Sequence, residues 1–399
     1  MTSLVDELLN ETNWYDYLEY KKQQLSISKY ELKYLEDYIS NKKYLDVVSK
    51  IVNNKYQFSI PIKHLINKIN SNKKRAIYCF NEDENMVLKL ITFLFTKRYD
   101  NKYSDNCYSF RKKYTVKDAI KKLSFIDKKM YGYKIDISNY FNSIDISLML
   151  NKLKDFISED IKLYNLLESI LKDNKAFFND NIVYENKGIM AGTPISSFLA
   201  NIYLYELDEY FKNNDIFYIR YSDDIIFFTD EDNIEYYKNK LLEIISLNKL
   251  IVNNDKVLYI NPESYWEFLG FSFKSYTIDI SDIALRKIKD KIKRASRKIY
   301  RWKIKKQVSD DKAMKTMINK FNKKFFKIEN EDGITWAVWY FPFINTIKSL
   351  KCIDSYLQQS IRYIKTGKYC KKNYNVKYKK LKELGYRTLV NEYYRFKKN

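Results

Sequence analysis

The sequence predicts a mixed α+β fold built around an antiparallel sheet, and three observations support this. Residues 131–138 and 216–229 are apolar, aromatic and β-branched, as strands are, and each carries aspartate at a strand end. Runs with apolar residues three and four apart lie around them and predict helices. The last third of the chain is helical in pattern and strongly basic. We therefore expect a central sheet among helices, followed by a basic helical domain.

Carboxylates gather at the ends of the predicted central strands. Residues 216–229 read IFYIRYSDDIIFFT and predict a β-hairpin whose turn displays Asp223 and Asp224, while Asp136 ends the earlier strand. Taken alone, the Asp-Asp pair fits a plain solvated turn. Three such carboxylates repel one another unless divalent cations lie between them. With no His or Cys nearby, oxygen ligands favour Mg²⁺, or Mn²⁺, over zinc. Two such ions holding a phosphoryl group are typical of polymerases and nucleases.

Three motifs carry a family resemblance. Residues 221–224 (YSDD) resemble the Y-x-D-D motif of reverse transcriptases. Residues 136–145 (DISNYFNSID) resemble the D-x4-F-x3-D palm motif of the bacterial members, and residues 188–202 (GIMAGTPISSFLANI) resemble the segment G-x-x-x-G-x-x-x-S-x-x-L-A-N. The order and spacing agree over roughly residues 56–275. The resemblance implies a right-hand polymerase fold with a retron- or group II intron-like palm, most similar to the defence-associated "unknown group" reverse transcriptases.

This resemblance implies a domain order. Residues 1–55 are expected to form an N-terminal helical extension that packs on the core or contacts a partner RNA. Residues 56–281 are expected to hold the fingers (about 56–128 and 151–185) and the palm (about 129–150 and 186–281). The insertion 146–185 is expected to be helical. Residues 282–399 are expected to form a basic helical thumb.

The resemblance also implies roles for single residues. Asp136, Asp223 and Asp224 would be the catalytic metal ligands, with the Ile137 carbonyl as a further metal contact. Six further residues would contact the nucleotide. Arg75 and Arg111 would bind the triphosphate, and Phe141 would be the steric gate beneath the sugar. Ala191 and Gly192 would lie beside the nucleotide, and Lys256 would lie near the leaving pyrophosphate. Asp145 is expected to be structural. Phe268, Leu269 and Gly270 would form the primer grip. Ala191 departs from the family pattern, in which Gln is usual, and this puts the use of a template in doubt.

The basic charge is unevenly spread along the chain. The chain has 72 Lys and Arg against 50 Asp and Glu, for a net charge of +22. Residues 282–399 hold 33 of the basic and 10 of the acidic residues, a net charge of +23, so the whole excess lies there. An AT-rich genome would favour lysine along the whole chain, so such a bias does not explain why the basic excess lies in the last third. We expect the predicted helix near 282–302 to bind nucleic acid through Lys293, Arg294, Arg297 and Lys298, opposite an apolar stripe. The residues of this stripe are Leu285, Ile288, Ile292, Ala295, Ile299 and Trp302.

The function expected from these features is RNA-directed DNA polymerisation in bacterial anti-phage defence. The expected partners are a noncoding RNA template, a cDNA product and dNTPs, with two Mg²⁺ ions as cofactors and a homo-oligomer or a second defence protein as further partners. Neither a signal peptide nor a membrane span is predicted, and four scattered cysteines fit a cytoplasmic protein. Two alternatives stay open: a template-independent or protein-primed DNA polymerase, and a catalytically silent RNA-binding scaffold.

Overall fold

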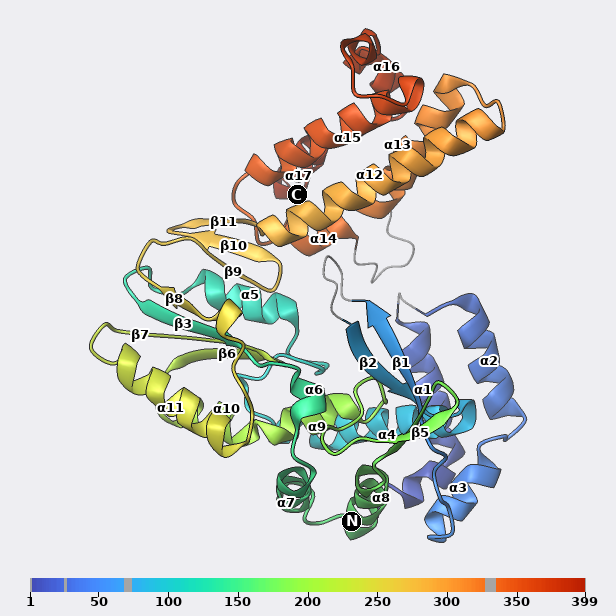
Figure 1. Cartoon of the computed structure of the whole chain (residues 1–399), viewed down its shortest axis with the longest axis vertical. Helices are drawn as coiled ribbons and strands as arrows, with labels where there is room; N and C mark the ends of the chain where they lie inside the picture. Colours follow the sequence, from blue (N-terminus) through green and yellow to red (C-terminus); the bar gives the residue numbers. More distant parts are fainter. Residues whose placement is uncertain (1, 25–26, 68–73, 327–334, 399) are drawn as a thin grey trace. The chain divides into compact units, whose positions relative to one another are not determined.

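The structure is a computed structural model that describes residues 2–24, 27–67, 74–326 and 335–398. The chain divides into two compact units. The first unit comprises Met1–Ala119 and Lys129–Asn261, and the second comprises Ile120–Lys128 and Pro262–Asn399. Figure 1 shows the elements of both units along the chain.

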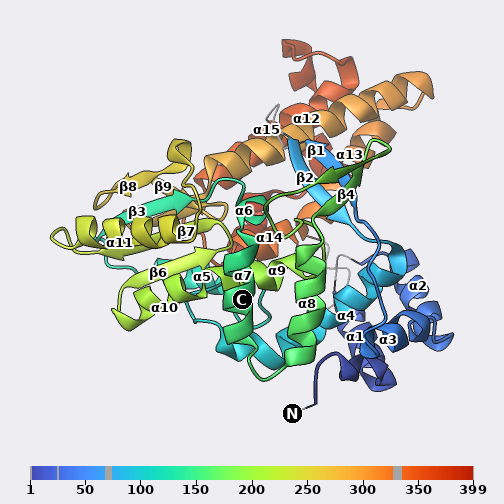
Figure 2. The same cartoon turned by 60° about the horizontal axis from the view of Figure 1, so that its bottom comes forward.

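The first unit contains the predicted antiparallel sheet. Its strand order is β6-β7-β3-β8, and all neighbours are antiparallel. The strands are β6 (Phe217–Tyr221), β7 (Asp224–Thr229), β3 (Tyr131–Asp136) and β8 (Leu258–Ile260). Helices α10 (Tyr205–Asn213) and α11 (Ile234–Leu247) lie against one face (Figures 1 and 2). The hairpin predicted at residues 216–229 is therefore confirmed, because its buried apolar side chains pack under these helices.

The N-terminal residues are helical and belong to the core of the first unit. Helices α1 (Glu11–Lys22), α2 (Lys29–Ser40) and α3 (Leu45–Val52) follow the short helix η1 (Asp6–Leu9) and lie beside α4 (Glu82–Tyr99). The ring of Trp14 stacks on Tyr44 at 4.6 Å. The start of the chain is anchored far along the sequence, since Ser3 Oγ and the Leu4 backbone N both donate to the Asp160 carboxylate at 2.5 and 2.7 Å.

A second sheet in the first unit corrects one expectation. Its order is β2-β1-β4-β5, formed by β1 (Ile62–Asn67), β2 (Lys74–Cys79), β4 (Lys175–Phe178) and β5 (Asn181–Tyr184). Residues 146–185 were expected to be helical throughout, but only α7 (Ile146–Phe156) and α8 (Ile161–Lys172) are helices. A β4–β5 hairpin follows, turning at Asn179 and Asp180 with positive φ. Asn and Asp tolerate this left-handed conformation better than most residues do.

Short elements complete the first unit and lead to the site. They are η2 (Asp100–Lys102), α5 (Val116–Ser124, which continues into the second unit), α6 (Tyr140–Ser143), α9 (Ser196–Tyr203) and η3 (Asn254–Lys256). The segment after Pro194 forms α9 and α10, and Leu199, Ile202 and Leu207 on these helices are buried.

The second unit begins about 20 residues before the boundary predicted at residue 282. Its three-stranded sheet has the order β11-β10-β9, with β9 (Trp266–Phe268), β10 (Phe271–Lys274) and β11 (Thr277–Ile280). The sheet joins the helices that follow because Ser349 donates to the buried Asp279 carboxylate and Asn345 Oδ1 accepts from the Ile278 backbone N. Those helices are α12 (Asp282–Lys305), α13 (Asp310–Phe326), α14 (Trp336–Tyr340), α15 (Lys348–Thr366), η4 (Lys371–Asn375), α16 (Tyr378–Glu383) and α17 (Leu389–Lys398).

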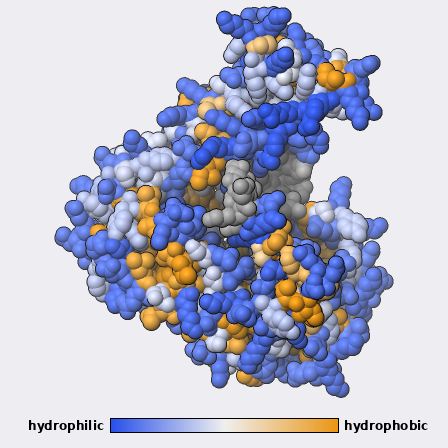
Figure 3. All heavy atoms as spheres, in the orientation of Figure 1, coloured by the Kyte–Doolittle hydropathy of each residue, from blue (hydrophilic) through white to orange (hydrophobic). Residues whose placement is uncertain are grey.

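Helix α12 has the predicted apolar stripe. Ile288, Ile292, Ala295 and Ile299 are buried, whereas Trp302, expected to belong to the stripe, is 37% exposed. The visible face of the second unit's helices is mostly hydrophilic (Figure 3). Within the described residues, no helix combines the length and apolar character needed to cross a bilayer.

Candidate active site

Strand register brings the three predicted carboxylates to one end of the first unit's antiparallel sheet. Asp136 is the last residue of β3 and lies directly opposite Asp224, the first residue of β7. Asp223 occupies the tight turn after Ser222, whose φ is +60°, and its carbonyl accepts a 3.1 Å bond from the Ile137 backbone N. A slip of one residue would send these side chains to opposite faces, so the apolar register of β3 and β7 sets the site.

Burial and mutual repulsion raise the pKa of the hairpin carboxylates. Burial, followed by the charge of Asp223, raises the pKa of Asp224 to about 6. Burial also raises the pKa of Asp223. The Lys256 Nζ lies 2.6 Å from Asp136 Oδ1, and the Asn253 side chain donates to Asp136 Oδ2 at 3.2 Å. Lys256 was predicted to meet the leaving pyrophosphate, yet here it neutralises a carboxylate expected to bind metal.

The donor set fits hard divalent cations. Across the described ranges, no three acidic, His or Cys side chains already converge as a metal-binding group. Mg²⁺ at phosphoryl-transfer sites is commonly held by one or two carboxylates together with substrate phosphates and water. Asp136 and Asp224 face each other, and raised pKa values at Asp223 and Asp224 match carboxylates whose charge a cation would compensate. The Ile137 carbonyl stays a predicted further ligand.

The raised pKa of Asp224 predicts a pH dependence of stability without metal. An acid whose pKa is higher in the folded than in the unfolded chain binds more protons when folded, so stability falls as pH rises between the two values. For Asp224 this window runs from about 4 to about 6. In chelator, Asp224→Asn should therefore be more stable than the parent at pH 7, by up to about 3 kcal/mol. This advantage should vanish near pH 4. Urea unfolding at both pH values measures it, and an advantage independent of pH would contradict the assignment.

A glycine-rich segment docks beside the carboxylates. Gly188 and Gly192 have φ of +95° and +102°, and a Cβ on Gly188 would lie 2.6 Å from Asn142 Cα. The carbonyl of buried Ala191 accepts a 2.8 Å bond from the Tyr78 backbone N on β2. The segment is thereby tied to the strand that carries Arg75. Contacts of Ala191 and Gly192 with a nucleotide stay predictions.

Arg75 and Phe141 lie in the same unit as the carboxylates. Arg75 is exposed on β2, and its charge lowers the pKa of Asp223, opposing the larger effect of burial. Phe141 is half-buried, and its carbonyl accepts a 2.9 Å bond from the Ile189 backbone N. Arg75 thus lies near enough to affect Asp223, and Phe141 is tied to the glycine-rich segment, while the roles of both residues toward a nucleotide stay predictions.

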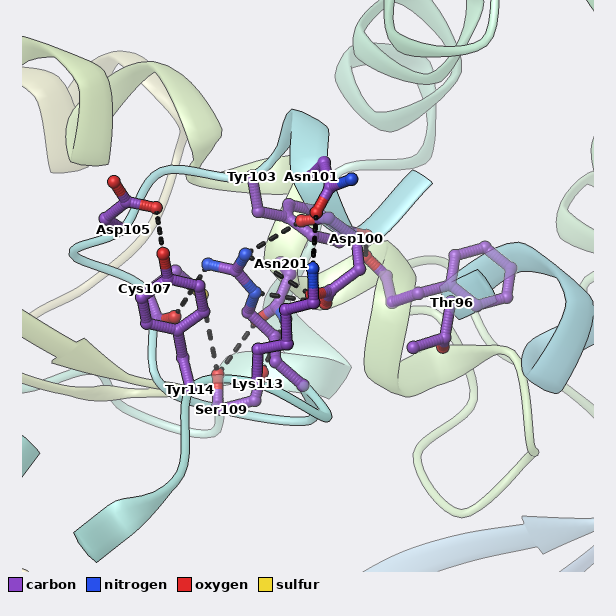
Figure 4. Close-up of polar contacts among 12 residues, drawn as sticks. Thr96, Asp100, Asn101, Tyr103, Asp105, Cys107, Ser109, Lys113, Tyr114 and Asn201 are labelled. Atoms are coloured by element: carbon purple, nitrogen blue, oxygen red, sulfur yellow. Dashed lines mark hydrogen bonds and ion pairs between the residues drawn. The ribbon is translucent and has the colours of Figure 1, made fainter. Parts of the chain in front are cut away.

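Arg111 is not placed to bind a triphosphate, and this corrects a prediction. Its side chain is 1% exposed and pairs with Asp100, with Nε 3.1 Å from Oδ1. Its Nη atoms donate to the carbonyls of Ser104, Cys107 and Asp100. Figure 4 labels Asp100 and Cys107 among the residues of this polar cluster. Because its N–H donors are satisfied inside the protein, Arg111 stabilises the segment that follows η2 and does not face a phosphate in the solvent.

The predicted primer grip and the basic helix lie in the second unit. Phe268 is 2% exposed, so its side chain is core packing of β9 and cannot itself touch a primer. Leu269 and Gly270 form the β9–β10 turn with φ of +48° and +88° and are partly accessible. On α12, the side chains of Arg294, Arg297 and Lys298 are exposed and that of Lys293 is half-buried.

One residue important for the hairpin was missed by the sequence reasoning. Arg220 is fully buried on β6 and binds both oxygens of Asp208 on α10, at 2.7 and 2.6 Å. Its Nη1 also donates to the Ser222 carbonyl at 3.4 Å, just before Asp223 and Asp224. The sequence does contain a signal for this residue: Arg220 is an arginine inside an otherwise apolar and aromatic strand, and a buried arginine requires a partner inside the protein.

The family comparison agrees with this geometry. The family described as reverse transcriptase (RNA-dependent DNA polymerase) matches residues 66–273, just over half of the chain. The chain therefore belongs to the reverse transcriptase family. The mixed α+β fold and the palm predicted for a right-hand polymerase agree with this membership.

Two curated relatives and two solved structures are similar to the chain. Retron Ec83 reverse transcriptase of Escherichia coli is 30% identical over 142 residues, covering 33% of this chain and 43% of the relative. The COX1/OXI3 intron 2 protein of Saccharomyces cerevisiae is 27% identical over 175 residues, covering 43% of this chain and 20% of the relative. The chain thus spans less than half the length of either relative. Apo telomerase from Candida tropicalis has a TM-score of 0.48 to this chain, and the match covers 87% of this chain and 73% of that chain. Telomerase from Candida albicans in complex with a telomeric RNA fragment has a TM-score of 0.47, and the match covers 87% of this chain and 68% of that chain. Each is 13% identical in sequence.

Proposed function

We propose that this chain is an RNA-directed DNA polymerase that makes cDNA by two-metal nucleotidyl transfer. The observation that carries the proposal is the pairing of Asp136 with Asp224 across β3 and β7, with Asp223 in the adjoining turn. Membership of the reverse transcriptase family supports it. Two bound Mg²⁺ or Mn²⁺ ions would supply charge stabilisation for the attacking and leaving oxygens.

The chain's own residues have separate roles in this proposal. Asp136, Asp223 and Asp224 hold the cations, with the Ile137 carbonyl beside them. Arg75 pairs with the triphosphate through its forked guanidinium, which suits phosphate oxygens. Lys256 leaves Asp136 when a cation binds, and its charge is then available to the leaving pyrophosphate. Leu269 and Gly270 contribute the accessible turn of the primer grip.

The template, the product and the biological role form the finer part of the proposal. A noncoding RNA is the template in cytoplasmic anti-phage defence, as expected from the sequence motifs, and the similarity to a retron reverse transcriptase supports an RNA-templated reaction. The alternative is DNA synthesis with little or no template, or primed from a protein tyrosine. Ala191 favours that alternative, because the family's usual Gln is absent at the position beside Gly192.

Primer extension separates these two functions. The purified chain is given an RNA template, an annealed DNA primer, four dNTPs and Mg²⁺. Extension that stops at the template's end and fails with a non-matching single dNTP supports templated synthesis. Extension without template, or product attached to protein after nuclease treatment, supports the alternative. Sequencing of copurifying nucleic acid then identifies the RNA. A chain that incorporates no nucleotide under any of these conditions contradicts both.

Phe141→Ala should admit ribonucleotides. The half-buried ring follows Asp136 by five residues and its backbone is fixed against Gly188 and Ile189, which suits a side chain beneath the sugar. The selectivity for dNTP over rNTP, measured as the ratio of kcat/KM values, should fall by about tenfold or more, the effect of losing roughly 1.4 kcal/mol of discrimination. An unchanged ratio in a folded variant would mean that Phe141 only packs the core.

A further inference from the structure

A clamped loop lies beside the predicted steric gate. The loop of residues 103–115 joins η2 to α5, and two buried arginines fix it. Arg111 holds the loop together from within, and Arg220 on β6 ties it to the palm. Arg111 donates to the Cys107 carbonyl at 3.1 Å, and Arg220 reaches the Cys107 Sγ at 3.3 Å. The Arg220 backbone also pairs with the loop on both sides, accepting from Tyr108 N and donating to the Asn106 carbonyl, each at 2.9 Å. The loop is therefore part of the rigid palm.

The residues on either side of Phe110 are fixed inside the protein. Ser109 is fully buried; its hydroxyl donates to Asn201 Oδ1 at 2.8 Å, and its carbonyl accepts from Asn201 Nδ2 at 2.7 Å. Figure 4 labels Ser109 and Asn201 within this cluster of polar contacts. Arg111, on the other side of Phe110, is held by the Asp100 carboxylate and by the carbonyls of Asp100, Ser104 and Cys107. Because the side chains of Ser109 and Arg111 are both held inside the protein, the side chain of Phe110 between them points toward the solvent.

Phe110 takes an unusual conformation as a result. Its φ is +56°, which is rare for a bulky residue, and the residue is 46% exposed. Such strain persists only where the surrounding contacts impose it, and it gathers at functional sites. The exposed ring is directed at one partner: it meets the ring of Phe141 edge-on, at 6.0 Å and 80°.

The ring of Phe141 is thereby held between two aromatic neighbours. Tyr140 meets it at 5.7 Å and 68°, and Tyr140 is itself fixed by a 2.6 Å bond from its hydroxyl to the Ala200 carbonyl. The backbone of Phe141 is bound to Ile189. Tyr140 is buried, so Phe110 is the partner on the accessible side.

We propose that Phe110 is a positioning residue that fixes the Phe141 ring and so helps to select the sugar of the incoming nucleotide. The inference rests on the proposed polymerase function and on Phe141 as the gate. Without the Phe110 ring, Phe141 can turn aside and leave room for a ribose 2′-hydroxyl. The expected loss of dNTP selectivity is roughly three- to tenfold, the size of one edge-on ring contact.

The test uses single variants, a double variant and a matched control in the full chain. Selectivity is the ratio of kcat/KM for dATP to that for ATP on one primed RNA template. Phe110→Ala should lower it through a lower KM for ATP, with kcat for dATP retained. Phe110→Gly also removes the ring but relieves the positive φ, so it should lose selectivity without losing thermal stability. Phe110→Tyr, which keeps the ring, should retain selectivity. Tyr236→Ala removes an exposed ring that meets Tyr237 at 83° on α11 and should change nothing.

The double variant Phe110→Ala/Phe141→Ala decides whether Phe110 acts through Phe141. Selectivity equal to that of Phe141→Ala alone supports the inference. Full additivity of the two losses overturns it, as does unchanged selectivity in both Phe110→Ala and Phe110→Gly.

Failure of this inference can be told apart from failure of the proposed function. If Phe141→Ala lowers selectivity and the Phe110 variants do not, only the inference is wrong. If the parent chain incorporates no nucleotide, the proposed function is wrong. In that case a 4-fluorophenylalanine label at position 141 still reads the ring contact, and a ¹⁹F resonance that does not move in Phe110→Ala contradicts the contact itself.

Discussion

Asp223→Asn should abolish nucleotide incorporation while leaving the fold and nucleic-acid binding intact. Asp223 lies in the turn beside the Asp136–Asp224 pair, and burial already raises its pKa, so its environment suits a carboxylate that meets a cation. Loss of one ligand removes much of the charge stabilisation at the reacting phosphate, which is worth several orders of magnitude in rate. Single-turnover extension of a primed RNA template measures this loss. Asparagine keeps the turn, because it adopts tight turns as readily as aspartate.

Asp215→Asn is the matched control for this variant. Asp215 is an exposed aspartate in a turn with φ of +55°, just before β6 of the same hairpin. Its replacement should leave the rate unchanged. Mn²⁺ binding followed by electron paramagnetic resonance should weaken in Asp223→Asn and not in Asp215→Asn. Robust incorporation by Asp223→Asn would mean that the hairpin is not the metal site.

Removal of the basic face of α12 should weaken nucleic-acid binding and its salt dependence together. Residues 282–399 hold 33 basic and 10 acidic residues. Each phosphate contact to a single strand contributes about −0.7 to the slope of log K against log salt, so about five to eight contacts give a slope of about −4 to −6. Replacing Lys293, Arg294, Arg297 and Lys298 with alanine should flatten the slope by about two units or more. Incorporation at physiological salt should fall and should partly recover at low salt with excess RNA.

A control with the same loss of charge tests whether position matters. Lys29, Lys33, Lys43 and Lys55 are exposed lysines of the first unit, on or beside its N-terminal helices. Their joint replacement removes four positive charges far along the sequence from α12. An equal loss of affinity and slope in this control would show that net charge, and not the α12 face, sets binding.

The sequence was most informative where local patterns determine structure. The apolar, aromatic and β-branched runs of β3 and β7 predicted both strands, and their register brings Asp136 opposite Asp224. The periodic apolar residues of α12 likewise predicted its buried face, except near its two ends, where Leu285 is half-buried and Trp302 is exposed. The roles that motif spacing assigns to Arg75 and Phe141 stay predictions.

Long-range contacts decide what the sequence could not show. The side chain of Arg111 is buried because the Asp100 carboxylate and three backbone carbonyls enclose it, and no local pattern separates such an arginine from an exposed one. The β4–β5 hairpin forms because β4 pairs with β1, more than 100 residues earlier. The second unit starts early because Asp279 binds Ser349, 70 residues later.

The anchoring of Ser3 and Leu4 to Asp160 bears on the order of events during synthesis. These contacts join residues 157 and 156 positions apart. The first residues leave the ribosome long before their acceptor is made, at about 5–20 residues per second. The contacts of Ser3 and Leu4 with Asp160 therefore form late, after α1–α3 and α4 have been made and can already pack on one another. Contacts between residues so far apart in sequence also predict that the first unit folds slowly, because the chain entropy of closing a long loop is lost before the contacts form.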